Sequence, residues 1–231
     1  MNTVLSNSAY FGFAITLIIY LICLKIKNKT KITLLNPLLT STIIIVAILL
    51  IGNVSYETYN SGAKYVSYFL TPTTVCLAIP LYKQIKTLKK NVLAILIGIF
   101  SGVIANAVVI VGMIKLFGMS NELGSSLLPK SITTPIALGV VQEIGGISSI
   151  TVFAVILSGI IGAVIAPTLF KLLRIKEDIS QGLACGTASH GSGTTTALEL
   201  GEVQGAMSGL AITVTGLITV IVAPIVNSIF F

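Results

Sequence analysis

Long apolar runs alternate with short polar segments along the whole chain. A helix needs roughly 20 mostly apolar residues to cross the hydrocarbon core of a bilayer. Runs near that length occupy residues 8–24, 33–52, 63–82, 91–117, 151–172 and 204–226. This pattern predicts an all-α polytopic membrane protein with about six spans. The run at 63–82 contains Pro72 and Pro80, so it is open to two interpretations, one kinked span or a broken element.

The basic residues fall into three clusters, each at the end of an apolar run. Lysine and arginine are enriched in cytoplasmic loops, so each cluster marks the cytoplasmic side of the membrane. The clusters are Lys25, Lys27, Lys29 and Lys31; Lys83, Lys86, Lys89 and Lys90; and Lys171, Arg174 and Lys176. With all three clusters on that side, the N-terminus and the C-terminus both lie outside.

Two further segments do not fit simple spans. Residues 127–149 are apolar but interrupted by Pro129, Lys130 and Pro135. If they crossed the membrane, the third basic cluster would face the wrong side, so we expect them to dip in and return. Residues 179–203 are too polar to face lipid and are expected to form two short helices broken at 190–193. The pattern therefore favours two re-entrant helical hairpins, with a cytoplasmic loop as the alternative for the second.

Two stretches of the chain resemble each other. Residues 158–167 align without gaps on residues 215–224, both end in Ala-Pro, and Glu143 and Glu199 precede them at similar offsets. Stretches built from only a few apolar residue types can match by chance. The paired Glu and Ala-Pro features nevertheless favour a duplicated unit of one hairpin plus one span. Because this unit crosses the membrane once, successive copies are inverted, as in elevator-like and related transporter architectures.

These patterns divide the chain at residue 126. Residues 1–126 hold the N-terminal spans, which we expect to form a scaffold or dimerisation part. Residues 127–231 hold a transport-like core of two hairpin-plus-span inverted repeats. Few spans remain to brace a moving core, so we expect a homodimer whose first spans supply the scaffold.

Composition excludes a water-soluble globule. Hydrophobic residue types make up 55% of the chain, charged types 9%, and the mean hydropathy is +1.03, whereas soluble domains carry about a quarter charged residues. The net charge of +7 is a topology marker here, so we expect the bilayer rather than nucleic acid as a partner. No residue spacing indicates a metal, a cofactor or a nucleophile–base pair, so we expect no metal site, no cofactor and no enzyme activity.

The first hairpin carries the motif Pro129-Lys-Ser-Ile-Thr-Thr-Pro135. A proline at each end breaks or starts a helix, which leaves hydroxyl and backbone N–H groups free for a carboxylate. The candidate substrate-binding residues are Ser131, Thr133, Thr134 and Pro135. The structural alternative is a capped helix start whose hydroxyls bond to backbone. Lys130 has two open roles, a counter-charge for an anion or a side chain that reaches the outer surface.

The second hairpin carries the motif Gly186-Thr-Ala-Ser-His-Gly-Ser-Gly-Thr-Thr-Thr196. Its glycines allow a backbone to approach a ligand, and its hydroxyls are neutral donors. The candidate substrate-binding residues are Thr187, Ser189, His190, Gly191, Gly193, Thr194 and Thr195. His190 is the only histidine of the chain and could act as a proton relay, or could simply tie the two hairpin arms together.

Acidic residues are rare in the second half of the chain. Glu143, Glu199 and Glu202 each follow or precede a predicted hairpin arm. An ionisable group inside a span is a candidate for proton or ion coupling. A structural role, such as capping a helix or pairing with Lys130, is the alternative.

The hairpin motifs resemble those of the LrgB/CidB family, whose plant relatives include the plastid glycolate/glycerate translocator. The resemblance is carried by Pro129-Lys-Ser-Ile-Thr-Thr-Pro-Ile-Ala, Glu143-Ile-Gly-Gly, Gly186-Thr-Ala-Ser-His and Ala197-Leu-Glu-Leu-Gly-Glu-Val-Gln-Gly-Ala-Met-Ser-Gly-Leu-Ala. It covers nearly the whole chain and is densest over residues 127–224. One departure is visible, because Ser189-His-Gly-Ser-Gly-Thr-Thr-Thr stands where the family pattern has Ser-His-Ala-Ile-Gly-Thr-Ala-Arg, so Thr196 replaces a basic residue.

The resemblance implies a protein of the bacterial cell (inner or plasma) membrane with one of two functions. The first is a secondary transporter or facilitator of small monocarboxylates such as pyruvate, with the substrate held between the hairpins. The second is a holin/antiholin-like regulator of murein hydrolase activity, lysis and programmed cell death, with a small LrgA-like membrane partner. The two hydroxyl-rich hairpins favour the transporter, since a simple pore does not need them.

Overall fold

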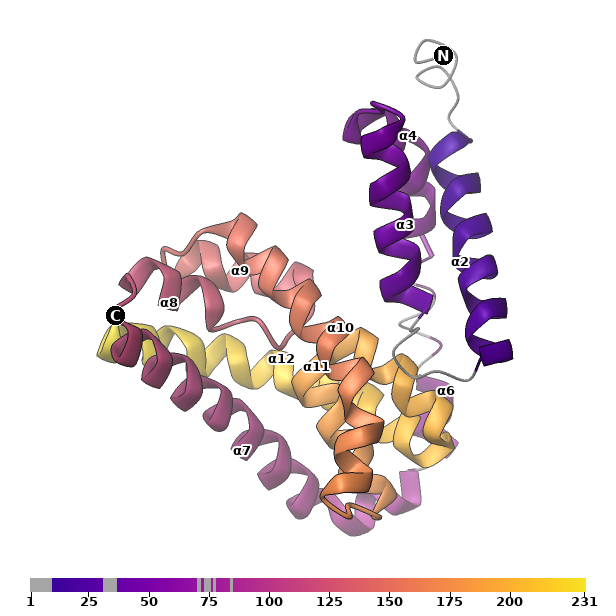
Figure 1. Cartoon of the computed structure of the whole chain (residues 1–231). Helices are drawn as coiled ribbons and strands as arrows, with labels where there is room; N and C mark the ends of the chain where they lie inside the picture. Colours follow the sequence, from indigo (N-terminus) through magenta and orange to yellow (C-terminus); the bar gives the residue numbers. More distant parts are fainter. Residues whose placement is uncertain (1–9, 31–36, 70–71, 73–75, 77, 84) are drawn as a thin grey trace. The chain divides into compact units, whose positions relative to one another are not determined.

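The computed structural model describes residues 10–30, 37–69, 72, 76, 78–83 and 85–231, and within these ranges the chain forms helices and no strand. The helices are α2 (Phe11–Thr30), α3 (Pro37–Ile51), α4 (Tyr56–Ser67), α6 (Ala78–Lys83), α7 (Ile85–Phe117), α8 (Asn121–Leu127), α9 (Thr134–Glu143), α10 (Ser148–Leu172), α11 (Asp178–Leu200) and α12 (Glu202–Phe230) (Figure 1). The all-α prediction is confirmed. The chain divides into two compact units, Met1–Cys76 and Leu77–Phe231, which are described separately.

The two compact units divide between residues 76 and 77, and the functional division at residue 126 stays a prediction. Helices α7 and α8 belong to the second unit, where α7 packs on α11 and α12 and α8 packs on α10. The apolar face of α7 is buried against those helices, which a reading of spans one at a time does not reveal. The assignment of a scaffold role to residues 1–126 stays a prediction.

Four described helices are long and apolar enough to cross a membrane. They are Phe11–Thr30, Lys89–Phe117, Ser148–Leu172 and Glu202–Phe230. Each coincides with a run that the hydropathy pattern predicts as a span. A fifth predicted span, 33–52, contains a shorter apolar helix, Leu39–Ile51, and residues 33–36 of it lie outside the described ranges.

The sixth predicted span, 63–82, is only partly described. Helix α4 ends at Ser67 and α6 begins at Ala78, while residues 70–71, 73–75 and 77 lie outside the described ranges. The choice between one kinked span and a broken element therefore stays open.

In the first unit, α2 packs on α3 and α4. A Cβ built on Gly12 would lie 1.9 Å from the carbonyl oxygen of Tyr59, so only glycine allows α4 to come this close. Next to it, the hydroxyls of Thr16 and Tyr59 are 2.8 Å apart. The Ser55 side chain accepts a hydrogen bond from Thr58 N and caps α4.

In the second unit, the segment α8–α9 enters the helical bundle and returns to the same end. At that end, Asn121 Nδ2 donates to Phe231 O over 2.8 Å, and Asn227 Nδ2 donates to Ile144 O over 3.2 Å. The segment between α8 and α9, residues 128–133, lies further in, where Asn106 Nδ2 donates to Leu128 O over 2.9 Å. We call residues 128–133 the first tip. Helix α8 begins six residues earlier than the predicted hairpin start at residue 127, because Ser120 caps it.

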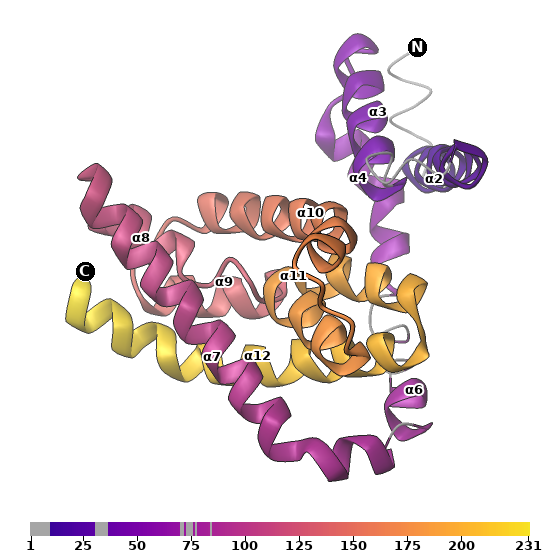
Figure 2. The same ribbon diagram turned by 60° about the horizontal axis from the view of Figure 1, so that its bottom comes forward.

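Helix α11 is interrupted at His190, whose backbone angles are φ 39° and ψ −128°. The chain reverses there. A Cβ built on Gly193 would lie 2.1 Å from Cys185 O, although residues eight apart along a straight helix are about 12 Å apart. Figures 1 and 2 show the two arms of α11, residues 178–189 and 191–200, lying beside α12. The predicted break at 190–193 is therefore present, and we call residues 187–193 the second tip.

Glycines set the distance between α11 and α12. Cβ atoms built on Gly182 and Gly186 would each lie 2.4 Å from a carbonyl oxygen, that of Gln204 and that of Ser208. The buried residues Ile95 and Ile99 of α7 pack against Met207 and Ala211 of α12 on the other side. A separate core surrounds α9, with Ala137 and Val140 packed near Val155 of α10 and Ala223 of α12.

This packing predicts a large difference between two glycine-to-alanine substitutions. Gly186→Ala should lower the free energy of unfolding in detergent by about 1–3 kcal/mol, since its methyl group meets backbone of α12. Gly112→Ala in α7 is the matched control, because a Cβ there has no described neighbour within 4 Å. Equal unfolding free energies for the two variants would contradict the close approach of α11 and α12.

Candidate functional site

The two tips meet near the middle of α10. The Ser158 hydroxyl donates to Lys130 O of the first tip over 2.7 Å, and His190 Nε2 of the second tip lies 3.0 Å from Val155 O. A Cβ on Gly159 would lie 2.7 Å from the His190 ring, so the ring packs directly on the backbone of α10. Val155, Ser158 and Gly159 thus bring both tips to one level of the bundle.

Helix α7 covers the same level from another side. Asn106 Nδ2 holds the first tip at Leu128 O, and Ser131 Oγ donates to Asn106 Oδ1 over 3.4 Å. At Gly102, an added Cβ would lie 2.7 Å from Thr187 Cγ2 of the second tip. The two tips are therefore held between α7 and α10.

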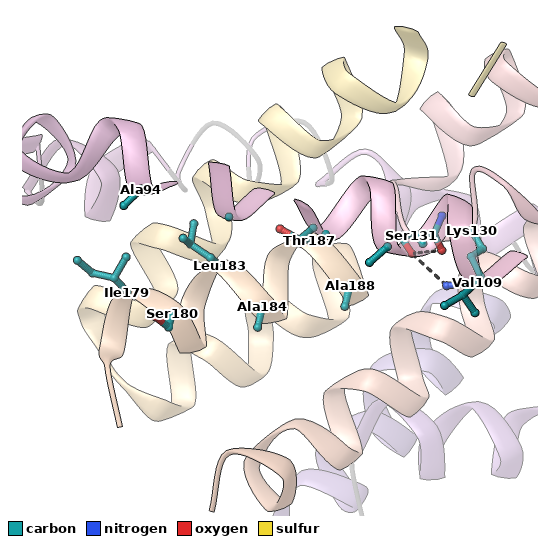
Figure 3. A pocket seen from close by; sticks show the side chains of 14 residues that line it. Ala94, Val109, Lys130, Ser131, Ile179, Ser180, Leu183, Ala184, Thr187 and Ala188 are labelled. Atoms are coloured by element: carbon teal, nitrogen blue, oxygen red, sulfur yellow. Dashed lines mark hydrogen bonds between the residues drawn. The ribbon is translucent and has the colours of Figure 1, made fainter. Parts of the chain in front are cut away.

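A cavity of about 610 Å³ lies between α7, the first tip and the first arm of α11. Figure 3 shows Ile179, Leu183, Ala184 and Thr187 along one side of it, with Lys130 and Ser131 at one end. Cavities that bind small molecules usually have volumes of about 300–1,000 Å³. The size is therefore that of a small-molecule site.

The polar groups of the cavity gather at the end formed by the first tip. Lys130 Nζ donates to Ser131 Oγ over 3.2 Å, and Ser131 Oγ in turn donates a hydrogen bond to Asn106 Oδ1. Within the part of the chain that the structure describes, the buried Thr187 Oγ1 has no hydrogen-bond partner. Among the described residues that line the cavity, Lys130 is the one that carries a charge. Such a site offers one positive charge and several neutral hydrogen-bonding groups on an otherwise apolar wall.

The predicted residues of the first hairpin separate into two groups. Lys130 and Ser131 line the cavity. Thr133 takes the N-cap position of α9 without a side-chain capping bond, and Thr134 and Pro135 form its first turn. These three lie outside the cavity lining, and their role in substrate binding stays a prediction.

In the second hairpin, only Thr187 of the predicted residues lines the cavity. The others face neighbouring helices or the surface. Ser189 packs on Gly162, His190 packs on Gly159, and Gly193 packs on Cys185. Thr194 Oγ1 donates to His190 O over 3.1 Å and lies 2.8 Å from Ser208 Oγ. Gly191 and Thr195 are exposed, and Thr195 Oγ1 donates to Gly191 O. These contacts hold the second tip against its neighbours, and the role of these residues in substrate binding stays a prediction.

The predicted acidic residues lie at helix ends. Glu143 is exposed at the end of α9, about 15 Å along that helix from the first tip. Glu199 is exposed in the last turn of α11. Glu202 Oε1 forms an ion pair of 3.2 Å with Lys83 Nζ, and both side chains are more than half exposed. Within the described ranges, none of the three lines the cavity or pairs with Lys130, and their role in coupling stays a prediction.

The cavity residues of α7 do not stand out in the sequence. Asn106, Gly98 and Gly102 lie in a long apolar run whose pattern predicts an ordinary span. A signal was present, because Asn106 is an amide in the middle of a membrane helix, and polar residues there usually face a partner or a cavity.

The fold and the helix lengths define a helical integral membrane protein with a small-molecule-sized cavity. A model of the LrgB-like family matches residues 16–229. Proteins named antiholin-like protein LrgB from Bacillus mycoides (strain KBAB4) and Bacillus cereus (strain B4264) are each 41% identical over 216 residues, which is 93% of this chain and 94% of theirs. The chain belongs to the LrgB-like family. No solved structure matches it significantly.

The hydrogen bond between Thr194 and Ser208 can be tested by a double-mutant cycle. Both side chains are buried, and they join the second arm of α11 to α12. Thr194→Val and Ser208→Ala should show a coupling of about 0.6 kcal/mol, as is typical of hydrogen bonds between membrane helices. The measurement is the free energy of unfolding of the wild type, both single variants and the double variant. Strictly additive effects would show that the two hydroxyls do not interact.

Proposed function

We propose that this protein is an antiholin-like component of the bacterial cell membrane. The observation that carries this proposal is the 41% identity, over 93% of the chain, to proteins named antiholin-like protein LrgB. In this role it would restrain a holin-type pore and so regulate murein hydrolase activity and lysis. Its partner would be a small LrgA-like membrane protein, and the chain itself would form a homodimer.

The antiholin-like proposal predicts a change in lysis. Removing the gene from a bacterium that encodes it should raise the extracellular murein hydrolase activity and the rate of autolysis, because the restraint is lost. Re-expression of the wild-type chain should restore the original rate, and a variant with a destabilised fold, Gly186→Ala, should restore it less. Unchanged autolysis in the deletion strain would contradict the proposal.

A second candidate function, the transport of small monocarboxylates such as pyruvate, is favoured by the convergence of the two tips on one cavity. We propose that α8–α9 and α11 are re-entrant hairpins that enter from opposite sides of the membrane. With α10 and α12 they would form two inverted repeats, a plan by which many secondary transporters place a site at the membrane midplane. Both termini would lie outside, since that orientation puts all three basic clusters in the cytoplasm.

The two functions are compatible. A membrane protein that moves a small carboxylate and also binds a small partner subunit would affect lysis through either activity. The relatives' names support the antiholin-like role, and the geometry of the second unit supports the transport role.

The transport proposal predicts saturable uptake of labelled pyruvate into liposomes that contain the purified protein, measured with and without a pH gradient. His190→Ala should lower the uptake by about threefold or more, since it removes the bond that holds the second tip to Val155. Ser228→Ala is the control, because its hydroxyl is exposed and bonds to the local Ile225 O. Equal leakage of pyruvate and an unrelated sugar would contradict transport.

A further inference from the structure

We infer that the cavity binds a small organic anion with a single negative charge, and that α7 forms one wall of this binding site. The anionic group would contact Lys130, Ser131 and Thr187, and the apolar part would lie against α7 at Gly98. The inference rests on the transport function proposed above and specifies the site and the charge of its ligand. The binding site would lie on the face of the second hairpin that meets α7, opposite the face on which His190 contacts α10.

The charge of the ligand follows from the charges of the lining. Lys130 is partly buried, and within the described ranges it has a hydrogen bond to Ser131 but no ion pair. None of the described residues that line the cavity is acidic. A buried charge is costly unless an opposite charge accompanies it. One lysine therefore calls for one negative charge, which a monocarboxylate supplies and a dicarboxylate exceeds.

The hydrogen-bonding partners of the ligand follow from Thr187. This residue is 8% exposed and is among the residues that line the cavity, and its buried hydroxyl has no hydrogen-bond partner within the described ranges. Buried hydroxyls in folded proteins are nearly always hydrogen-bonded. A carboxylate oxygen in the cavity would accept a hydrogen bond from Thr187 and a charge-assisted hydrogen bond from Lys130. The second buried hydroxyl that lacks a partner in the described ranges, that of Thr215, is not among the residues that line the cavity.

The apolar part of the ligand follows from the small residues of α7. Gly102 lets Thr187 approach, because a Cβ there would lie 2.7 Å from Thr187 Cγ2. At Gly98, a Cβ would lie 3.7 Å from Leu183 Cδ1, an ordinary van der Waals contact. A Cβ at residue 98 is therefore accommodated without displacing the helices, and the further atoms of a larger side chain would take up part of the cavity. A cavity of about 610 Å³ is within the size range of small-molecule sites.

The test is the binding of sodium pyruvate to the full-length protein in detergent, measured by isothermal titration calorimetry. Lys130→Met and Thr187→Val should each weaken binding by about tenfold or more, as expected for the loss of a hydrogen bond to a charged group. Lys130→Arg keeps the charge and should bind pyruvate better than Lys130→Met. Thr187→Ser keeps the hydroxyl and should bind pyruvate better than Thr187→Val. Ser228→Ala is the control, because its hydroxyl is exposed and bonds to the local Ile225 O, and it should bind like the wild type.

Three further ligands define the charge and the size of the anion. Succinate, with two carboxylates, and neutral hydroxyacetone should bind more weakly than pyruvate. Gly98→Val should weaken the binding of a longer monocarboxylate such as hexanoate more than that of pyruvate. Preferred binding of inorganic phosphate, or competition by vesicles rich in anionic phospholipid, would overturn the inference in favour of a phosphate group.

The same variants separate this inference from the transport proposal. If Lys130→Met, Thr187→Val and wild type take up pyruvate into liposomes at equal rates, the inferred site is wrong and transport stands. If the wild type binds pyruvate as inferred but moves none across the membrane, the site stands and transport is wrong. If a substitution lowers the melting temperature by several degrees, its conservative counterpart, Lys130→Arg or Thr187→Ser, decides the result.

Discussion

The close backbone contact between α11 and α12 is the constraint on which the second unit depends. Lipid tails are as apolar as leucine side chains, so helices in a membrane associate through close packing rather than through the hydrophobic effect. Gly182 and Gly186 provide this packing, since any larger residue would meet the backbone of α12. Gly193 provides the equivalent contact between the two arms of α11. These three glycines fix where the chain reverses, and so they place the second tip.

The reversal itself stores local strain that neighbouring groups hold in place. His190 has φ 39°, a region that residues other than glycine rarely occupy. Such a conformation persists only where the surroundings determine it. Here the His190 ring bonds to Val155 O, and its carbonyl oxygen accepts the Thr194 hydroxyl. The single histidine of the chain is therefore accounted for by its structural contacts, and the candidate ligand contacts lie on the other face of the same hairpin.

The sequence was most informative where local chemistry decides the structure. The break at residue 190 follows from the run of glycine, serine and threonine, and the start of α9 follows from Pro135. Helix α4 does not follow from hydropathy, because its first residues are polar and its close contact with Gly12 of α2 is a tertiary one. Asn106 and Gly102 were missed for a related reason. Periodicity shows that α7 is apolar, but which of its faces meets the two tips is decided by tertiary packing.

The lone lysine of the cavity has a consequence for the response to membrane voltage. In a transporter with this site, a protonated Lys130 gives the empty site a charge of +1, and a bound monoanion cancels it. A potential of 100 mV changes the free energy of moving one charge across the membrane by about 2.3 kcal/mol. A cytoplasm at negative potential would therefore draw the empty site inward, while movement of the loaded site would be insensitive to voltage. The step that the cell's electrical gradient accelerates or retards would be the return of the unoccupied protein.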